Sequence, residues 1–138
     1  MLFRSIVHRV HDILAQVGLS AAIWKMPAQL SGGMRRRVAL ARALIAHPKF
    51  VLLDDPTAGL DPVASSVIMD LVRSSYTRLN EPGMIVVSHD LRRLLPVVDR
   101  VICLGAGHIV FDGSPHEIKT AVSEVKNFVG CRYDLDRL

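Results

Sequence analysis

Apolar residues recur at helical spacing near the start of the chain. Between Ser5 and Val17 they lie three or four positions apart, and Gly18 follows where a helix C-cap is expected. This pattern predicts an amphipathic helix. A second helix is predicted after Ser31, which can serve as its N-cap, and Pro48 stops it.

Two uninterrupted apolar runs, residues 50–53 and 84–87, are each followed by polar residues. Such runs are typical of parallel strands that are buried on both faces. Between them, Asp61 and Pro62 make an N-cap and first-turn pair for a helix that ends by residues 80–83. The sequence therefore predicts a strand–helix–strand crossover that brings polar groups to one edge of a sheet.

The last third of the chain predicts a hairpin and a helix. The apolar runs 101–104 and 108–111 are joined by a glycine-rich link, and Ser114 with Glu117 forms a capping box. The helix that this box opens is expected to reach Phe128. The polar end of the chain is expected to be flexible.

Composition narrows the class of protein. With 138 residues and a mean hydropathy of +0.31, the chain is long enough for one core. It contains neither an apolar run of about 18 residues nor a secretory signal pattern, which predicts a soluble, cytoplasmic protein. Cys103 and Cys131 lack metal-ligand spacing and are interpreted as ordinary thiols.

The net charge of +4 and the pI near 9.5 raise nucleic acid as a partner. The excess of basic residues is small, and these residues are dispersed along the chain. Its densest piece, Arg35 to Arg37, lies inside a helical pattern, where basic side chains more often face solvent or an acidic loop of a partner. No nucleic-acid partner is predicted.

Three groups of residues carry candidate chemistry. Ser31-Gly32-Gly33 opens a helix, where free backbone N–H groups favour an anion, although many such tripeptides are simple caps. Asp54 ends a strand and can help to hold hydrated Mg²⁺, and Asp55 can orient or deprotonate a water. Alternatively, one aspartate caps the following turn and the other is solvated.

His89 follows the second predicted strand and so emerges at the same sheet edge as Asp54, where it can hydrogen-bond a terminal phosphate. A structural role for this histidine is the alternative, and Asp90 can simply cap the next helix. His8 and His11 are three apart on a helix, but without a third ligand nearby they are expected to be solvated.

Four segments in a fixed order resemble the ATPase cassette of ABC proteins. They are Leu30-Ser31-Gly32-Gly33-Met34, the strand with Asp54-Asp55, Gly59-Leu60-Asp61-Pro62, and Ser88-His89-Asp90. The resemblance implies an α/β fold with the later part of a RecA-like P-loop NTPase sheet. It divides the chain into a partial helical subdomain at residues 1–46, an ATPase-core half at 47–130 and a tail at 131–138.

The resemblance also implies roles for single residues. ATP would be contacted by Ser31, Gly32, Gly33, Met34, Asp61 and Ser88. Of these, the signature residues Ser31, Gly32 and Gly33, which open the signature helix, would face a nucleotide held mainly by a second ATPase subunit. Asp54 would organise Mg²⁺. Asp55 would occupy the general-base position, and His89 would sense the γ-phosphate.

More narrowly, Lys25-Met26-Pro27 and Met34 are similar to the ATPases of lipid-asymmetry and solvent-resistance importers, which work with MCE proteins. The segment from Val125 to Gly130 resembles the closing helix of that subfamily. The implied partners are an integral-membrane permease and an MCE-type lipid-binding protein, with the ATPase peripheral on the inner face of the membrane.

Two departures from the family matter. No Gly-x-x-x-x-Gly-Lys-[Ser/Thr] occurs, so we expect weak ATP affinity from these residues alone and a truncated sequence. Asp55 is one methylene shorter than the usual glutamate, which predicts slow hydrolysis. The alternatives are a non-catalytic remnant or interaction module, and a fragment of a DNA-repair ATPase, which the absence of long heptads and zinc-binding cysteines disfavours.

Overall fold

The computed structural model describes residues 2–78 and 82–119. They form two compact units that divide between His89 and Asp90. The predicted subdomain boundary near residue 46 and the tail at 131–138 stay predictions. The described elements confirm the mixed α/β class with a parallel sheet.

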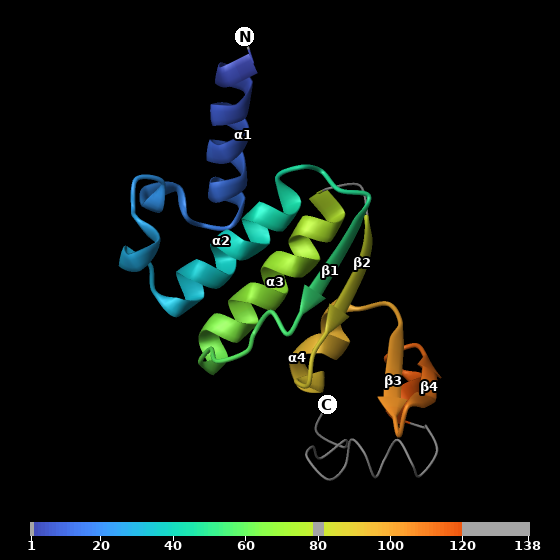
Figure 1. Cartoon of the computed structure of the whole chain (residues 1–138). Helices are drawn as coiled ribbons and strands as arrows, with labels where there is room; N and C mark the ends of the chain where they lie inside the picture. The colour runs from blue at the N-terminus through green and yellow to red at the C-terminus, as the bar shows by residue number, and fades with distance from the viewer. Residues whose placement is uncertain (1, 79–81, 120–138) are drawn as a thin grey trace. The chain divides into compact units, whose positions relative to one another are not determined.

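The first helix of unit one, α1 (Leu2–Gln16), ends as its sequence predicts (Figure 1). Gly18 has a φ of +67° and its N–H bonds to the Ala15 carbonyl at 3.0 Å, while the Leu19 N–H bonds to the Leu14 carbonyl at 2.7 Å. This pair of bonds is a Schellman motif, which satisfies the last carbonyls of the helix. Two single-turn 3₁₀ helices follow, η1 (Ser20–Ala22) and η2 (Pro27–Gln29).

The two central helices begin at the predicted caps. Helix α2 (Gly32–Leu44) has Ser31 as N-cap, whose Oγ accepts the Met34 N–H at 3.2 Å. Helix α3 (Pro62–Arg78) starts after Asp61, whose Oδ1 accepts two backbone N–H groups of the first turn at 2.9 and 3.0 Å. Both helices therefore start where their sequences supply an oxygen for otherwise unpaired amides.

Strands β1 (Phe50–Asp54) and β2 (Gly83–Val87) pair in parallel, in a register that sets Asp54 opposite Val87. The predicted crossover through α3 is thereby confirmed. The two carboxyl ends lie at one edge of the sheet, so the polar residues that follow each strand come together.

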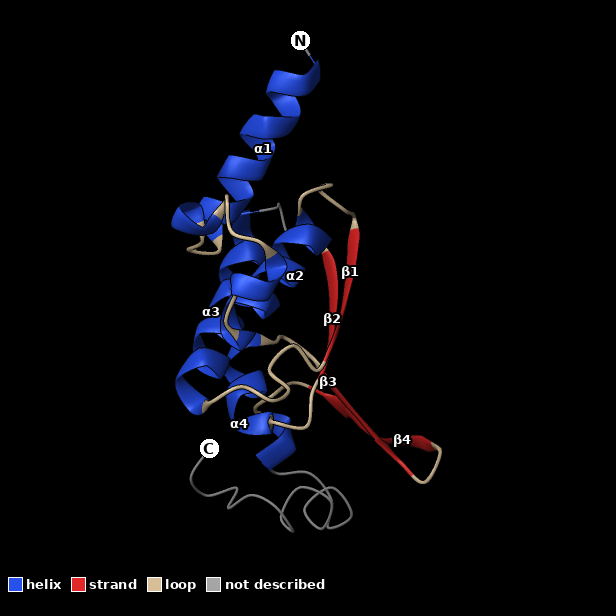
Figure 2. Ribbon diagram, turned by 60° about the vertical axis from the view of Figure 1, so that its left-hand side comes forward, coloured by secondary structure: helices blue, strands red, loops and turns tan. Residues whose placement is uncertain are grey.

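One core holds the elements of the first unit together. Helices α2 and α3 lie side by side against one face of the sheet (Figures 1 and 2). Leu44 and Val17 are almost completely buried in this core. Its buried members are Ile13, Val17, Leu19, Leu40, Ala41, Leu44, Val51, Leu53 and Val72.

The opposite face of this sheet corrects the prediction of strands buried on both sides. Phe50 and Leu52 are 57% and 64% exposed, and Ile85 and Val87 are 49% and 52% exposed. Inward and outward residues alternate along β1, as in a sheet with one covered face. Among the described residues of this unit, nothing packs on the outer face (Figure 2).

The second unit begins with the short helix α4 (Leu91–Leu94), for which Asp90 is the N-cap and also pairs with Arg93. After η3 (Leu95–Val97), the strands β3 (Val101–Gly105) and β4 (His108–Gly113) form the predicted antiparallel hairpin. Ala106 and Gly107, with φ values of +48° and +82°, make its turn. Two positive φ angles in a two-residue loop match the right-handed twist of a hairpin.

The capping box of the second unit is confirmed. The Ser114 N–H donates to Glu117 Oε2 at 2.7 Å, and the Glu117 N–H donates to Ser114 Oγ at 3.4 Å. The Ser114 N–H and the Ser114 hydroxyl, at 2.7 and 2.8 Å, both donate to Oε2 and lower the pKa of the Glu117 carboxyl, the backbone bond contributing most. The box opens the turn η4 (Glu117–Lys119), and the helix predicted to reach Phe128 lies outside the described residues.

Two further side chains of this unit have a shifted pKa. Cys103 is buried between the hairpin and η4, and burial raises the pKa of its thiol. Arg100 makes two 2.7 Å bonds to Asp112, which lower the pKa of that carboxyl. Cys131 lies outside the described residues.

Candidate functional site

The end of β1 delivers two carboxylates in different directions. Asp54 is the last residue of the strand and is exposed on its outer face. Asp55 leaves the strand with a φ of +40°, and its N–H still bonds to the Val87 carbonyl at 2.8 Å. A positive φ is uncommon for a residue other than glycine, although aspartate tolerates it better than most. Asp55 is therefore held against the end of β2.

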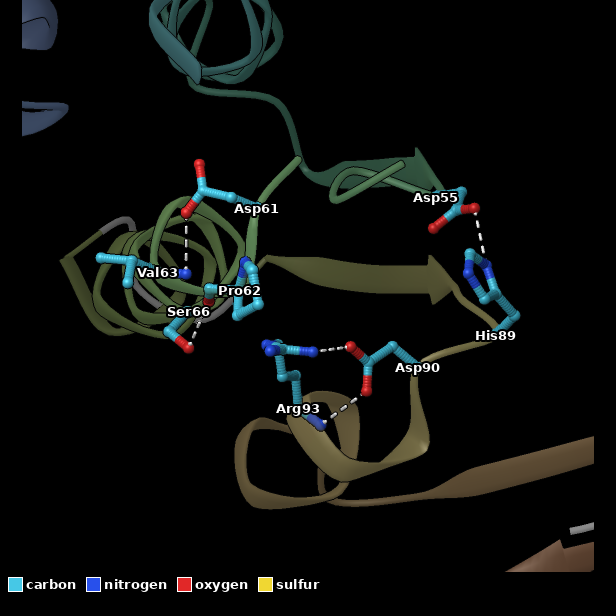
Figure 3. Close-up of polar contacts among 8 residues, drawn as sticks. All are labelled: Asp55, Asp61, Pro62, Val63, Ser66, His89, Asp90 and Arg93. Carbon is cyan, nitrogen blue, oxygen red and sulfur yellow. Dashed lines mark hydrogen bonds and ion pairs between the residues drawn. The ribbon is translucent and has the colours of Figure 1, made fainter. Parts of the chain in front are cut away.

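This backbone position brings Asp55 to the imidazole that follows β2. Asp55 Oδ2 lies 2.8 Å from His89 Nδ1, and Figure 3 shows the two side chains converging from the ends of neighbouring strands. The prediction that the strand-end histidine emerges beside the acidic strand end is confirmed. The direct carboxylate–imidazole contact was not predicted, because the sequence does not show the turn in backbone direction at Asp55.

The carboxylate of Asp55 is more sheltered than its partner. Its side chain is 29% exposed, whereas that of His89 is 64% exposed. Asp55 Oδ1 is buried and has no hydrogen-bond partner within the described part of the chain. A buried carboxylate oxygen without a partner is costly, and such groups are concentrated at sites that bind water or ions. The turn-capping alternative is not observed, because the Asp55 side chain bonds His89.

The signature helix offers the second set of candidate residues. Ser31 caps α2, and the amides of the first helical turn, which begins with Gly32 and Gly33, have no partner within a helix. Beyond its capping bond to Ser31, Met34 packs against the core. This geometry is that of a helix start at which an anion can bind.

The start of α2 lies against the loop that precedes α3. A Cβ on Gly32 would come within 3.8 Å of Leu60, and one on Gly33 within 3.7 Å of Ala64. A depression of about 360 Å³ opens between the helix and the loop. Its lining residues are Gly32, Arg35, Arg36, Ala39, Ala58, Gly59 and Leu60.

Arg35 and Arg36 are exposed, as expected of basic side chains on a helix, but the triplet also makes contacts within its own unit. Each guanidinium donates to a backbone carbonyl of its own unit. Arg35 reaches Leu30 at 3.0 Å, and Arg36 reaches Ala58 at 3.1 Å. Arg37 reaches the two carbonyls at the end of α1, at 3.3 and 3.4 Å. The cluster thus ties the signature helix to two other segments, which nothing in the local sequence pattern indicated.

The predicted site residues therefore fall into two groups. Asp54, Asp55, Ser88 and His89 gather at the carboxyl edge of the sheet, while Ser31 to Met34 and Asp61 lie at the starts of α2 and α3. Among the described residues, no printed hydrogen bond or ion pair joins the two groups, and the roles implied for them by the resemblance stay predictions.

His8 and His11, the weaker candidates on α1, are both exposed. His8 is 79% exposed and lies 3.4 Å from Asp12. Within residues 2–78 and 82–119, no cluster of three or more metal-ligating side chains is present. None of the described helices has the length and apolar character required to cross a bilayer.

Comparison with known proteins shows which family these features resemble. The ABC transporter family matches residues 5–58, which include the signature and both aspartates. The chain is 41% identical, over 84% of its length, to the chloroplastic protein TRIGALACTOSYLDIACYLGLYCEROL 3 of Arabidopsis thaliana. It is 39% identical, over 87% of its length, to a phosphonates import ATP-binding protein of Roseobacter denitrificans. A methionine import ATP-binding protein of Caulobacter vibrioides is 40% identical over 80% of the chain.

The fold agrees with these relatives. The structure of cbiO1 from Clostridium perfringens, part of the ABC transporter complex cbiONQ, superposes with a TM-score of 0.78 at 33% identity. It covers 94% of this chain, and this chain covers 51% of it. The chain spans 38%, 44% and 33% of the three relatives named above. In sequence and in fold, the chain is therefore similar to part of the ATP-binding subunits of ABC transporters.

Proposed function

We propose that the chain is part of an ATPase that powers an ABC transporter. It would supply the signature residues and the sheet edge at which ATP is hydrolysed. The observation that carries this proposal is the contact between Asp55 and His89 at the carboxyl edge of two parallel strands. Ligands of open α/β sheets bind at that edge. A carboxylate and an imidazole at one strand end are suited to position a water and to meet a terminal phosphate.

Mg²⁺ accompanies ATP in this proposal, and the residues present fit it. Asp54 is exposed at the strand end, and Asp55 Oδ1 is a buried carboxylate oxygen without a partner. Magnesium is commonly held by one or two carboxylates together with waters and phosphate oxygens, so a cluster of three protein ligands is not required. Asp54 would hold the ion, which neutralises charge on the phosphates.

The signature residues serve a second nucleotide in this proposal. Ser31, Gly32 and Gly33 would face ATP held by another ATPase subunit, with Met34 and Asp61 close to the same interface. The support is that Ser31 and Asp61 lie at the starts of α2 and α3, whereas Asp55 meets His89 at the carboxyl edge of the sheet. A pair of subunits that face each other head to tail would bring each signature helix to the other subunit's strand edge, and Ser88 would contact the nucleotide there.

The transported compound is proposed to be a phospholipid or another hydrophobic molecule. Support comes from Lys25-Met26-Pro27 and Met34 in the sequence, and from a relative whose name refers to a diacylglycerol lipid. Other relatives are named for import of phosphonates and methionine, so the family alone does not select the compound. An integral-membrane permease and an MCE-type protein would be the partners, with the chain on the cytoplasmic surface of the membrane.

A chimera tests the ATPase proposal. The chain would be joined behind the part of Clostridium perfringens cbiO1 that it does not cover, which supplies a phosphate-binding loop. We expect ATP binding and slow hydrolysis, abolished by His89→Ala and retained in His108→Ala, an exposed hairpin histidine. Binding without hydrolysis would favour the non-catalytic module, and absence of ATP binding by a folded chimera would overturn the proposal.

The third candidate, a DNA-repair ATPase fragment, has its own test. Electrostatic binding to DNA weakens steeply with salt. Because each arginine from 35 to 37 donates to a carbonyl of its own unit, we expect no such binding. Fluorescence anisotropy with duplex DNA at two salt concentrations would detect it.

A further inference from the structure

The segment between α1 and α2 presents two large apolar side chains to solvent. Trp24 is 88% exposed and Met26 is 67% exposed, and Lys25 between them is exposed as well. Trp24 is the most exposed large hydrophobic residue in the part of the chain that the structure describes. Single exposed apolar residues are common, but an aromatic and a thioether side chain exposed at one loop are typical of an interaction site.

Local hydrogen bonds fix the backbone of this loop. The Lys25 N–H donates to the Ala22 carbonyl at 2.9 Å, and the Met26 N–H donates to Gln29 Oε1 at 2.8 Å. The Gln29 N–H donates in turn to the Met26 carbonyl at 2.9 Å. The two apolar side chains are therefore held outward by an ordered backbone, which lowers the entropy cost of binding a partner.

The charge around the loop is unevenly distributed along the sequence. Basic residues are dispersed, but acidic residues are not. Residues 1–53 contain eight Lys and Arg and a single acidic residue, Asp12, which gives a formal charge of +7. The other twelve acidic residues lie between Asp54 and the end of the chain. Such asymmetry between two parts of a chain indicates an anionic partner, either a membrane surface or a nucleic acid.

The loop lies away from the acidic end of the sheet. In Figure 1, the blue segment with η1 and η2 lies on the side of α2 opposite to β1 and β2. Asp54 and Asp55 belong to the strand side of this unit. An anionic surface can therefore approach Trp24 without meeting these two carboxylates.

We propose that Trp24 and Met26 insert into the headgroup region of an anionic lipid bilayer, while Lys25 pairs with the lipid phosphates. Tryptophan suits this depth because its ring is apolar and its N–H can still donate to a polar group. A lysine beside it can extend its ammonium to the phosphates while its stem stays on apolar surface. The inference goes beyond the proposed ATPase function and needs no nucleotide.

Nucleic acid fits the same loop less well. Binding to single strands combines several stacking aromatics with a basic groove. Trp24 is the chain's single tryptophan, and each arginine from 35 to 37 already donates to a carbonyl of its own unit. Two inserted side chains bury little surface, so we expect weak, reversible membrane binding that adds to attachment through a permease.

Fluorescence of the single tryptophan tests the insertion on the 138-residue chain. Vesicles of phosphatidylcholine mixed with phosphatidylglycerol should shift the emission of Trp24 to the blue and protect it from acrylamide. Phosphatidylcholine vesicles alone should do neither, and added salt should reverse the effect because it screens the attraction. Far-ultraviolet circular dichroism would establish that the chain and each variant are folded.

Matched variants separate the loop from the rest of the surface. Lys25→Glu should weaken sedimentation with anionic vesicles roughly tenfold or more, and Arg92→Glu, with the same change of net charge at an exposed site of the second unit, should weaken it less. Trp24→Ala should weaken sedimentation about tenfold. Met26→Ala should weaken it as well, whereas Leu104→Ala, at a side chain that is 66% exposed on the hairpin, should not.

Several outcomes would overturn the inference. They are the absence of vesicle binding by the folded chain, vesicle binding without a blue shift, and equal losses in Lys25→Glu and Arg92→Glu. A blue shift with a single-stranded oligonucleotide but not with vesicles would assign the loop to nucleic acid instead. Because the vesicle assay contains no ATP, its failure leaves the ATPase proposal to the chimera, and failure of the chimera leaves the membrane contact to the vesicle assay.

Discussion

The uncovered face of the first sheet can be tested with two adjacent leucines. Leu52 and Leu53 are neighbours on β1 and point to opposite faces. Leu53 is 9% exposed and lies within the core, whereas Leu52 is 64% exposed. Truncation of each to alanine removes the same atoms from the same strand. Any difference between the two variants therefore measures what packs on each face.

The expected magnitudes follow from burial. Truncation of a buried leucine costs about 2–5 kcal/mol, because transfer energy is lost and a cavity remains. Complete burial of a leucine side chain contributes about 1.5–3 kcal/mol, so the third of Leu52 that is covered contributes roughly 0.5–1 kcal/mol. Leu53→Ala should therefore lower the free energy of unfolding by at least ~1 kcal/mol more than Leu52→Ala.

Urea denaturation followed by far-ultraviolet circular dichroism measures the difference, since the three longest described helices belong to this unit. Fluorescence of Trp24 is a poor probe because that side chain is 88% exposed. With a slope of about 1–3 kcal/mol per molar urea, the two midpoints should be separated by roughly a third of a molar or more. Equal losses for both variants would mean that the outer face is packed, and would refute the reasoning.

Three further predictions concern single side chains. Arg36→Ala should speed amide exchange in residues 58–60 several-fold, because it removes the bond to Ala58, whereas Arg35→Ala should not; equal exchange in both would contradict this. The pKa of Glu117 is lowered on folding, so its contribution to stability is present above its ordinary value near 4.5 and lost as pH falls through the lower folded value. In Glu117→Gln, the loss of stability as pH falls through this range should therefore be smaller than in the wild type. An acid-denaturation curve identical to that of the wild type would refute the prediction. Burial raises the pKa of the Cys103 thiol, so labelling by iodoacetamide at neutral pH should be slow until urea unfolds the second unit, as mass spectrometry of the labelled peptide would show.

Local signals in the sequence predicted most of the elements. Ser31 and Asp61 mark the helix starts, and Gly18 marks a helix end, because each choice depends on contacts within four residues. The hairpin and the capping box at Ser114 are likewise local. The pairing of β1 with β2 was predictable because a crossover helix leaves little alternative.

The contacts that join distant segments were not predictable in the same way. An uninterrupted apolar run reads identically whether one face or both faces are covered, so the exposure of Leu52 was missed. Arg36 is an exposed surface charge, and its bond to a carbonyl 22 residues away was missed. Neither feature changes the periodicity of apolar and polar residues in the sequence.

The sequence by itself determined the chemical groups of the site and the order in which they occur. The tertiary structure decided which of them meet: the positive φ of Asp55 turns its carboxylate toward the imidazole of His89, while the signature residues lie with the loop before α3. The physical reason is that residue types follow from the chain alone. Distances between side chains depend on backbone geometry and on packing between segments that are far apart in sequence.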